Sequence, residues 1–89
     1  MNKIMDIDFD KGAKTLKCIS DPTRIKIVHL LSCQEMCVCT LEQYFTLSQP
    51  TLSHHLHILK EDGIVTMRKE GKWIFYKIHE GVAEAMTQF

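Results

Sequence analysis

The sequence predicts a mainly α-helical fold that carries one β-hairpin (α+β). Apolar residues recur at helical spacing over several stretches before residue 63. Two β-prone runs, IVTMRK and KWIFYKI, then follow, and the EG between them is a hairpin signal. With 89 residues the chain makes a single domain, residues 1–89. A domain this small buries only about 60–65% of the surface of its unfolded chain, and such chains often gain stability by dimerising.

Two helices are predicted in the N-terminal part. Residues 9–19 place Ala13 and Ile19, among other apolar residues, at helical spacing. SDPTR then marks a helix start, because Ser20 or Asp21 can cap it and Pro22 lies where a missing N–H costs nothing. The following run, IKIVHLLSC, is apolar nearly all round, which predicts a central buried helix.

A short helix and a longer one are predicted next, over about residues 40–61. The short helix spans residues 40–46 with Thr40 as its cap, and LSQPT ends it. Ser48 caps the longer helix and Pro50 lies in its first turn, while Gly63 ends it. Its inward residues repeat at i, i+3, i+4 and i+7; they are Leu52, His55, Leu56 and Leu59.

The hairpin, over about residues 64–78, precedes a weakly amphipathic last helix, over about residues 80–89. The resulting order is helix, helix, short helix, turn, helix, hairpin, helix. That order is typical of a winged helix-turn-helix, in which the hairpin forms the wing.

Composition excludes some functions. Eleven basic residues balance eleven acidic ones, so net charge indicates neither nucleic acid nor membrane as a partner. The N-terminus lacks a signal-peptide pattern and no run of about 20 apolar residues exists, so we expect a cytoplasmic protein that does not cross a membrane. We expect its four cysteines to be reduced. No nucleophile has a patterned base, so we expect no enzyme.

Local features nevertheless predict binding to double-stranded DNA. The outward side chains of the longer helix suit base edges and phosphates; they are Gln49, Thr51, Ser53, His54 and His57. The hairpin tip carries Arg68, Lys69 and Lys72 against Glu70, a basic patch where a wing would reach phosphates. The alternatives are a solvated helix face and a hairpin whose basic residues only discourage strand pairing. We expect His55 to be a satisfied inward histidine.

Three segments resemble the ArsR/SmtB family of bacterial metal-sensing repressors, above all its arsenical-resistance members. They are SDPTRIKIVHLL, MCVCTLEQYFTLSQPTLSHHLHILKEDGIV and RKEGKWIFYKI. The resemblance, over about residues 13–79, implies a homodimer, an operator with two half-sites and repression relieved by an inducer. It implies that the helices at residues 9–19 and 80–89 pair across the dimer. The dimer residues would be Phe9, Leu16, Val82, Met86 and Phe89.

Three cysteines, Cys33, Cys37 and Cys39, lie within seven residues. In an extended segment residues i and i+2 point to the same side, so Cys37 and Cys39 form a two-thiol claw with Val38 inward. Cys33 can close over this claw from the preceding helix. Three thiolates favour soft ions, and As(III) and Sb(III) form pyramidal three-thiolate complexes. We therefore expect one of them to be the inducer, with no cofactor needed to bind DNA.

Departures from the family pattern leave alternatives open. Some arsenical repressors carry a third cysteine where this chain has Glu42, so the third ligand is Cys33 or else Cys18. Cys18 also suits a helical core position. Cadmium, lead or bismuth could replace arsenic as the thiophilic ion. A thiol redox or persulfide-responsive repressor is the remaining alternative, although persulfide-sensing relatives tend to use a cysteine on the last helix, where this chain has none.

Overall fold

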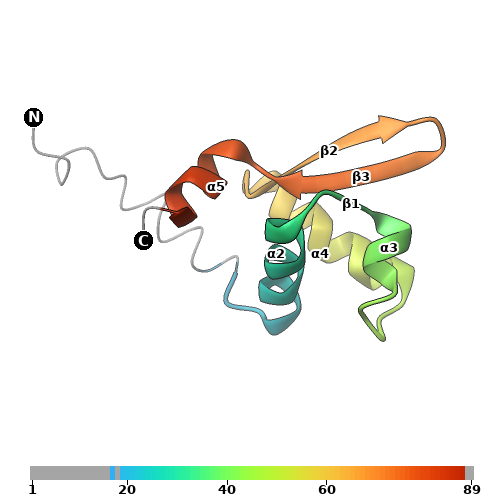
Figure 1. Ribbon diagram of the computed structural model, residues 1–89. Helices are drawn as coiled ribbons and strands as arrows, with labels where there is room; N and C mark the ends of the chain where they lie inside the picture. Colours follow the sequence, from blue (N-terminus) through green and yellow to red (C-terminus); the bar gives the residue numbers. More distant parts are fainter. Residues whose placement is uncertain (1–16, 18, 88–89) are drawn as a thin grey trace, which may run out of the picture.

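The computed structural model describes residues 17 and 19–87, and the side chains among them up to Glu84 (Figure 1). The helix predicted over residues 9–19 therefore lies almost wholly outside the described residues. The elements run in the predicted order, with one added strand. They are α2 (Pro22–Cys33), β1 (Met36–Cys37), α3 (Val38–Glu42), α4 (Gln49–Glu61), β2 (Val65–Glu70), β3 (Trp73–Ile78) and α5 (Glu80–Thr87).

Helix α2 begins and is buried largely as its sequence predicts. Asp21 is the N-cap, and its carboxylate accepts a hydrogen bond from the Arg24 N–H at 3.1 Å, with Pro22 in the first turn. The buried face comprises Ile27, Val28 and Leu31. The prediction of an all-round buried helix is wrong at Ile25, whose side chain is 51% exposed.

Helix α4 has the predicted boundaries at both ends. The Ser48 hydroxyl accepts a hydrogen bond from the Thr51 N–H, which satisfies one of the free donors of the first turn. At the other end Gly63 has φ +74°, which a residue without Cβ adopts without strain. The Ile64 N–H then donates to the Leu59 carbonyl at 2.9 Å, closing a Schellman motif.

Strands β2 and β3 form the predicted hairpin, and β1 adds a third strand that the sequence did not predict. The sheet order is β1-β3-β2, and both pairings are antiparallel. Met36 pairs with Tyr76, and Cys37 pairs with Phe75. Gly71, with φ +62°, lies in the tight turn between β2 and β3. Figure 1 shows this hairpin extending beyond the helices.

The core lies where α2, α3 and α4 meet the base of the sheet. Leu41 comes from α3, and the leucines of α4 predicted to face inward are buried there. The fully buried side chains are Ile27, Leu41, Leu52, Leu56, Leu59, Ile64 and Val65. The packing holds α3 and α4 in a fixed relation and leaves the outer face of α4 exposed.

Candidate metal and nucleic-acid site

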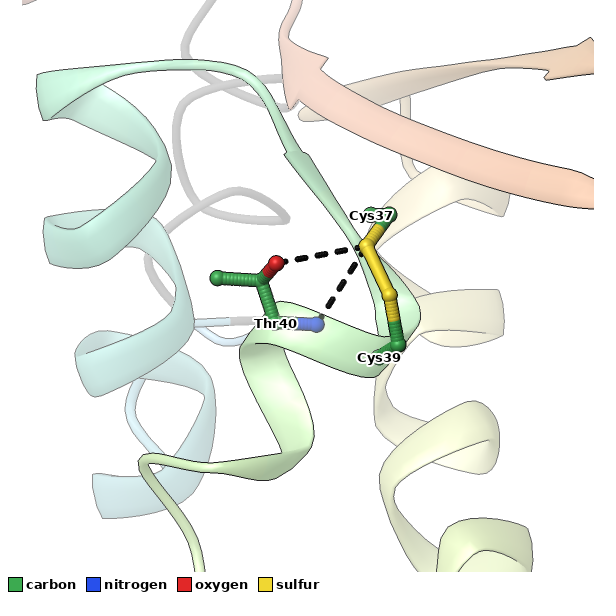
Figure 2. The surroundings of a disulfide bond; sticks show 3 residues. All are labelled: Cys37, Cys39 and Thr40. Atoms are coloured by element: carbon green, nitrogen blue, oxygen red, sulfur yellow. Dashed lines mark hydrogen bonds between the residues drawn. A yellow bond between two sulfur atoms is a disulfide. The ribbon is translucent and has the colours of Figure 1, made fainter.

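Cys37 and Cys39 meet at the junction between β1 and α3. Cys37 ends the strand and is the N-cap of α3, where its sulfur accepts a hydrogen bond from the Thr40 N–H at 3.3 Å. Cys39 lies in the first turn of that helix. A disulfide joins the two, with Cα atoms 5.4 Å apart (Figure 2). The convergence of these two sulfurs is as the sequence analysis predicted.

The path of the chain around the pair differs from the prediction. Helix α3 spans Val38–Glu42 rather than residues 40–46, and Cys37 rather than Thr40 is its cap. The two cysteines therefore do not share one extended segment: extended backbone ends at Cys37 and the helix then turns Cys39 back toward it. Val38 is half-buried against the core, as predicted. The expectation of reduced thiols also differs from the disulfide in this structure.

Cys33 does not close over the pair in this structure. It is the last residue of α2, is exposed, and its thiol donates to the His29 carbonyl at 3.6 Å. Within residues 17 and 19–87, no three His, Cys, Asp or Glu side chains are placed to hold a metal ion. The cause is local: strand pairing with β3 holds Cys37 on the sheet, while Cys33 stays on the exposed side of its helix. Cys18 lies outside the described residues.

The outer face of α4 carries the side chains proposed to contact DNA. All of them are exposed: Gln49, Thr51, Ser53, His54 and His57.

His55 points inward as expected, but its Nδ1 atom is buried without a hydrogen bond and lies 3.9 Å from the Asp21 carboxylate. The hydrogen bond from the Arg24 N–H is the main cause that lowers the pKa of Asp21. The expectation of a satisfied His55 was therefore wrong.

The basic side chains of the wing differ in their surroundings. Arg68 donates to Glu35 through Nε at 3.0 Å and through a terminal nitrogen at 2.7 Å, and it also pairs with Glu70. Its guanidinium lies 4.4 Å from the centroid of the Phe75 ring. Hydrogen bonding to Glu35 raises the pKa of Arg68, and the same bond lowers the pKa of Glu35.

These contacts join Arg68 to Glu35, which lies on the loop that leads to β1, while the Arg68 side chain stays 47% exposed. No local sequence pattern indicates this pairing, because Glu35 and Arg68 are 33 positions apart. Lys69 is exposed. Lys72 is exposed too, with its Nζ atom 5.2 Å from the centroid of the Trp73 ring.

A hollow of about 300 Å³ joins the cysteine pair to the proposed DNA-binding surface. One wall is the pair with Val38, and another is Gln49 and Ser53 on α4. Glu42 of α3 adds a carboxylate, and the hairpin supplies the rest through Lys72, Trp73, Ile74 and Tyr76. Burial raises the pKa of the Tyr76 phenol. The sequence analysis missed this hollow, because it depends on β3 crossing next to α3.

Comparison with known proteins decides the family. The family described as bacterial regulatory protein, arsR family, matches residues 21–67, more than half of the chain. The chain belongs to the ArsR family. The matched segment runs from the cap of α2 into β2, so it contains both the cysteine pair and the exposed face of α4.

Similar proteins agree with that assignment. An arsenical resistance operon repressor of Staphylococcus aureus is 42% identical over 73 residues, covering 82% of this chain and 70% of that protein. A CadC homologue of the same species, a cadmium resistance regulator, is 45% identical over 69 residues, covering 76% and 57%. A homodimeric winged helix-turn-helix domain of Mycobacterium bovis superposes with TM-score 0.78 and 31% identity, covering 90% and 77%. This ArsR-family chain is thus a winged helix-turn-helix regulator.

The remaining predictions concern the dimer and the membrane. Val82 is half-buried against the core. Phe9, Leu16 and Phe89 lie outside the described residues, as does the side chain of Met86. In the part of the chain that the structure describes, no helix is long and apolar enough to cross a bilayer.

Proposed function

We propose that this ArsR-family chain is an operator-binding repressor that releases DNA when As(III) or Sb(III) binds Cys37 and Cys39, with Cys33 as the third thiolate. One observation carries the proposal: the sulfur of Cys37 caps the first helix of the helix-turn-helix. A ligand that takes this sulfur competes with the Thr40 N–H for it. Inducer binding thus acts on the start of α3 directly.

The change at α3 has a short path to the DNA-binding face. Leu41 of α3 is fully buried among the side chains that also hold α4, so a shift of α3 moves the packing under the recognition helix. Inducer binding can drive DNA release only if the DNA-free repressor binds the inducer more tightly than the DNA-bound repressor does. The coupling free energy between two such sites is typically about 1–3 kcal/mol. Cys33 must approach the pair for three-thiolate binding, and its place at the end of α2 leaves it free of the core.

The DNA complex in this proposal uses α4 and the wing. Gln49, Thr51, Ser53, His54 and His57 read the major groove, and Lys69 and Lys72 reach phosphates beside it. Two copies bind two half-sites as a homodimer, with the helices at residues 9–19 and 80–89 pairing between them. In this proposal residues 1–89 make up a single winged helix-turn-helix DNA-binding domain.

Serine substitutions test the inducer site. Serine accepts the same capping hydrogen bond as the Cys37 sulfur but does not bind arsenic as thiolate. We expect Cys37→Ser and Cys39→Ser to bind DNA from upstream of the protein's own gene within about twofold of wild type, and to keep it in arsenite. Fluorescence anisotropy of labelled DNA, with phosphine-reduced protein, measures both. Release of DNA from either variant by arsenite would overturn the site.

A redox-responsive repressor is the second candidate, and the disulfide between Cys37 and Cys39 favours it. In that case oxidation of the pair, rather than a metalloid, changes the cap of α3. The same DNA assay separates the two: release by an oxidant or a polysulfide without arsenite supports the redox function. Cadmium, lead and bismuth salts in parallel titrations identify another thiophilic inducer.

A further inference from the structure

A row of paired residues connects the cysteine pair with the wing. Cys37 of β1 pairs with Phe75 of β3, and Phe75 pairs in turn with Arg68 of β2. Glu35 lies two residues before Cys37, on the loop that leads into β1. Its carboxylate accepts two hydrogen bonds from Arg68, at 3.0 and 2.7 Å. The segment that ends in the cysteine pair is therefore joined to the wing by side chains as well as by strand pairing.

The guanidinium of Arg68 is held on several sides. Glu35 accepts hydrogen bonds from Nε and from one terminal nitrogen, and such a two-point contact fixes the plane of a guanidinium. The other terminal nitrogen donates to Glu70, and the Phe75 ring lies 4.4 Å from the guanidinium carbon. Because a displacement of Glu35 cannot leave all of these contacts intact, it is transmitted to β2.

We propose that Glu35 is a positioning residue through which the inducer site controls the wing. The inference rests on the proposed function and adds a second route from the cysteine pair to DNA, beside the route through α3 and α4. In the DNA-bound form Glu35 holds Arg68, and the wing stays in place against the phosphates. When an inducer takes the sulfur of Cys37, the end of β1 shifts, Glu35 withdraws from Arg68, and the wing leaves that place.

The wing needs such a contact because its outer part has little buried packing. Figure 1 shows the hairpin extending beyond the helices. Along β2, Val65 is buried, the next two residues are half-buried, and the residues from Arg68 onward are exposed. Segments with few buried contacts move at low cost in free energy. Glu35 contacts the strand at Arg68, where burial ends, so it restrains the part of the hairpin that the core does not hold.

Glu70 offers a matched control, because it contacts Arg68 without joining two elements. It belongs to β2, so its ion pair with Arg68 stays within the hairpin. Its side chain is 66% exposed, against 28% for Glu35, so solvent screens the Glu70 pair more strongly. Glu35→Gln and Glu70→Gln each remove one negative charge beside Arg68. A glutamine offers a single oxygen, so Glu35→Gln also removes the two-point contact between the loop and the wing.

DNA titrations with and without arsenite test the proposal on the reduced full chain. Fluorescence anisotropy gives the DNA dissociation constant in each condition, and the ratio of the two constants measures how far arsenite weakens DNA binding. We expect Glu35→Gln to lower this ratio about fivefold or more, and Glu70→Gln to leave it within about twofold of wild type. In equilibrium dialysis without DNA, Glu35→Gln should bind arsenite at least as tightly as wild type, because its cysteines are unchanged.

An Arg68→Met background separates the contact from any other effect of Glu35. Arg68→Met alone should lower the ratio as Glu35→Gln does, since it removes the other partner. In this background Glu35→Gln should lower the ratio no further, because the contact is already absent. A merely structural role of Glu35 would instead weaken DNA binding by the same factor with and without arsenite, which leaves the ratio unchanged.

The inference and the proposed function fail differently. If arsenite weakens DNA binding equally in wild type and in Glu35→Gln, the route through the wing is overturned and the inducer site stands. An equal effect of Glu70→Gln, or weaker arsenite binding by Glu35→Gln, overturns the same route, because the link between β1 and the wing is then not what matters. If arsenite leaves the DNA affinity of wild type unchanged, the proposed function is overturned together with the inference.

Discussion

Single residues at helix starts decide how the DNA-binding motif is built. Ser48 and Cys37 each accept a hydrogen bond from an N–H in the first turn of the helix that follows. Serine is a preferred cap, and its position before QPTL was evident from sequence. Cysteine is not among the preferred caps, so Thr40 was predicted in its place.

Loss of the Ser48 cap should destabilise the domain. Ser48→Ala removes the acceptor for the Thr51 N–H, which costs about 1 kcal/mol in typical helices. We expect a lower urea midpoint with an unchanged slope, which indicates a change in stability alone. Ser53→Ala, at an exposed position of the same helix, is the control and should not be destabilising. Equal midpoints for the two variants would contradict a capping role for Ser48.

At the scale of elements, Glu35 and Arg68 tie the hairpin to the loop before β1. Two hydrogen bonds join their side chains, and Glu70 and the Phe75 ring complete the surroundings of the guanidinium. The tie connects the segment next to the cysteine pair with the strand that carries the wing. Arg68 was predicted to reach DNA phosphates, and its contacts with Glu35 and Glu70 also hold the wing to the loop before β1.

The Glu35–Arg68 contact should make the stability of the folded protein fall at acid pH. Hydrogen bonding to Arg68 lowers the pKa of Glu35 below its ordinary value of 4.5. A lowered pKa stabilises the folded state above pH 4.5, and this contribution is lost as pH falls through the lowered value. As pH falls through this range, the temperature of thermal unfolding should therefore drop less in Glu35→Gln than in wild type.

Arg68→Met is the partner control for the acid effect. In an Arg68→Met background, Glu35→Gln should no longer alter the pH dependence, since the interaction that lowers the pKa of Glu35 is already gone. If Glu35→Gln changes the pH dependence of stability equally in both backgrounds, the Glu35–Arg68 contact is not the source of that dependence.

Sequence patterns predicted the elements that depend on neighbours along the chain. The periodicity of α4, its cap and its terminal glycine are all local signals, and the hairpin needs only two β-prone runs and a turn. Strand β1 has two residues and exists because β3 lies beside it, so no local pattern could predict it. The hollow and the tie to Glu35 depend on the same long-range arrangement.

For the whole molecule, equal numbers of acidic and basic residues mean that DNA affinity must come from a few placed charges. Lys69 lies in β2 and Lys72 in the turn between β2 and β3, on a hairpin that extends beyond the helices (Figure 1). Arg68, two residues from the turn, is already paired with carboxylates. The electrostatic part of DNA binding should thus be small and confined to the wing and α4.

The salt dependence of the DNA-binding constant should reveal which of these charges contact phosphates. Each lysine that contacts a phosphate contributes about 0.9 to the slope of log K against log salt, so Lys69→Ala should lower the slope by about 1. Lys69→Arg keeps the charge and should leave the slope unchanged. DNA anisotropy titrations over a series of salt concentrations measure both, and equal slopes for the two variants would show that Lys69 makes no phosphate contact.

Pairing of β1 with β3 limits where such a chain can change in length. Cys37 lies opposite Phe75 in the sheet, and a shift of one residue in a strand turns every side chain to the other face. An insertion of one residue within β1 would therefore disturb the pairing at Cys37, whereas an insertion at the hairpin turn leaves β1 in register with β3. A cysteine pair of this kind moved into another winged helix must therefore bring the matching strand with it.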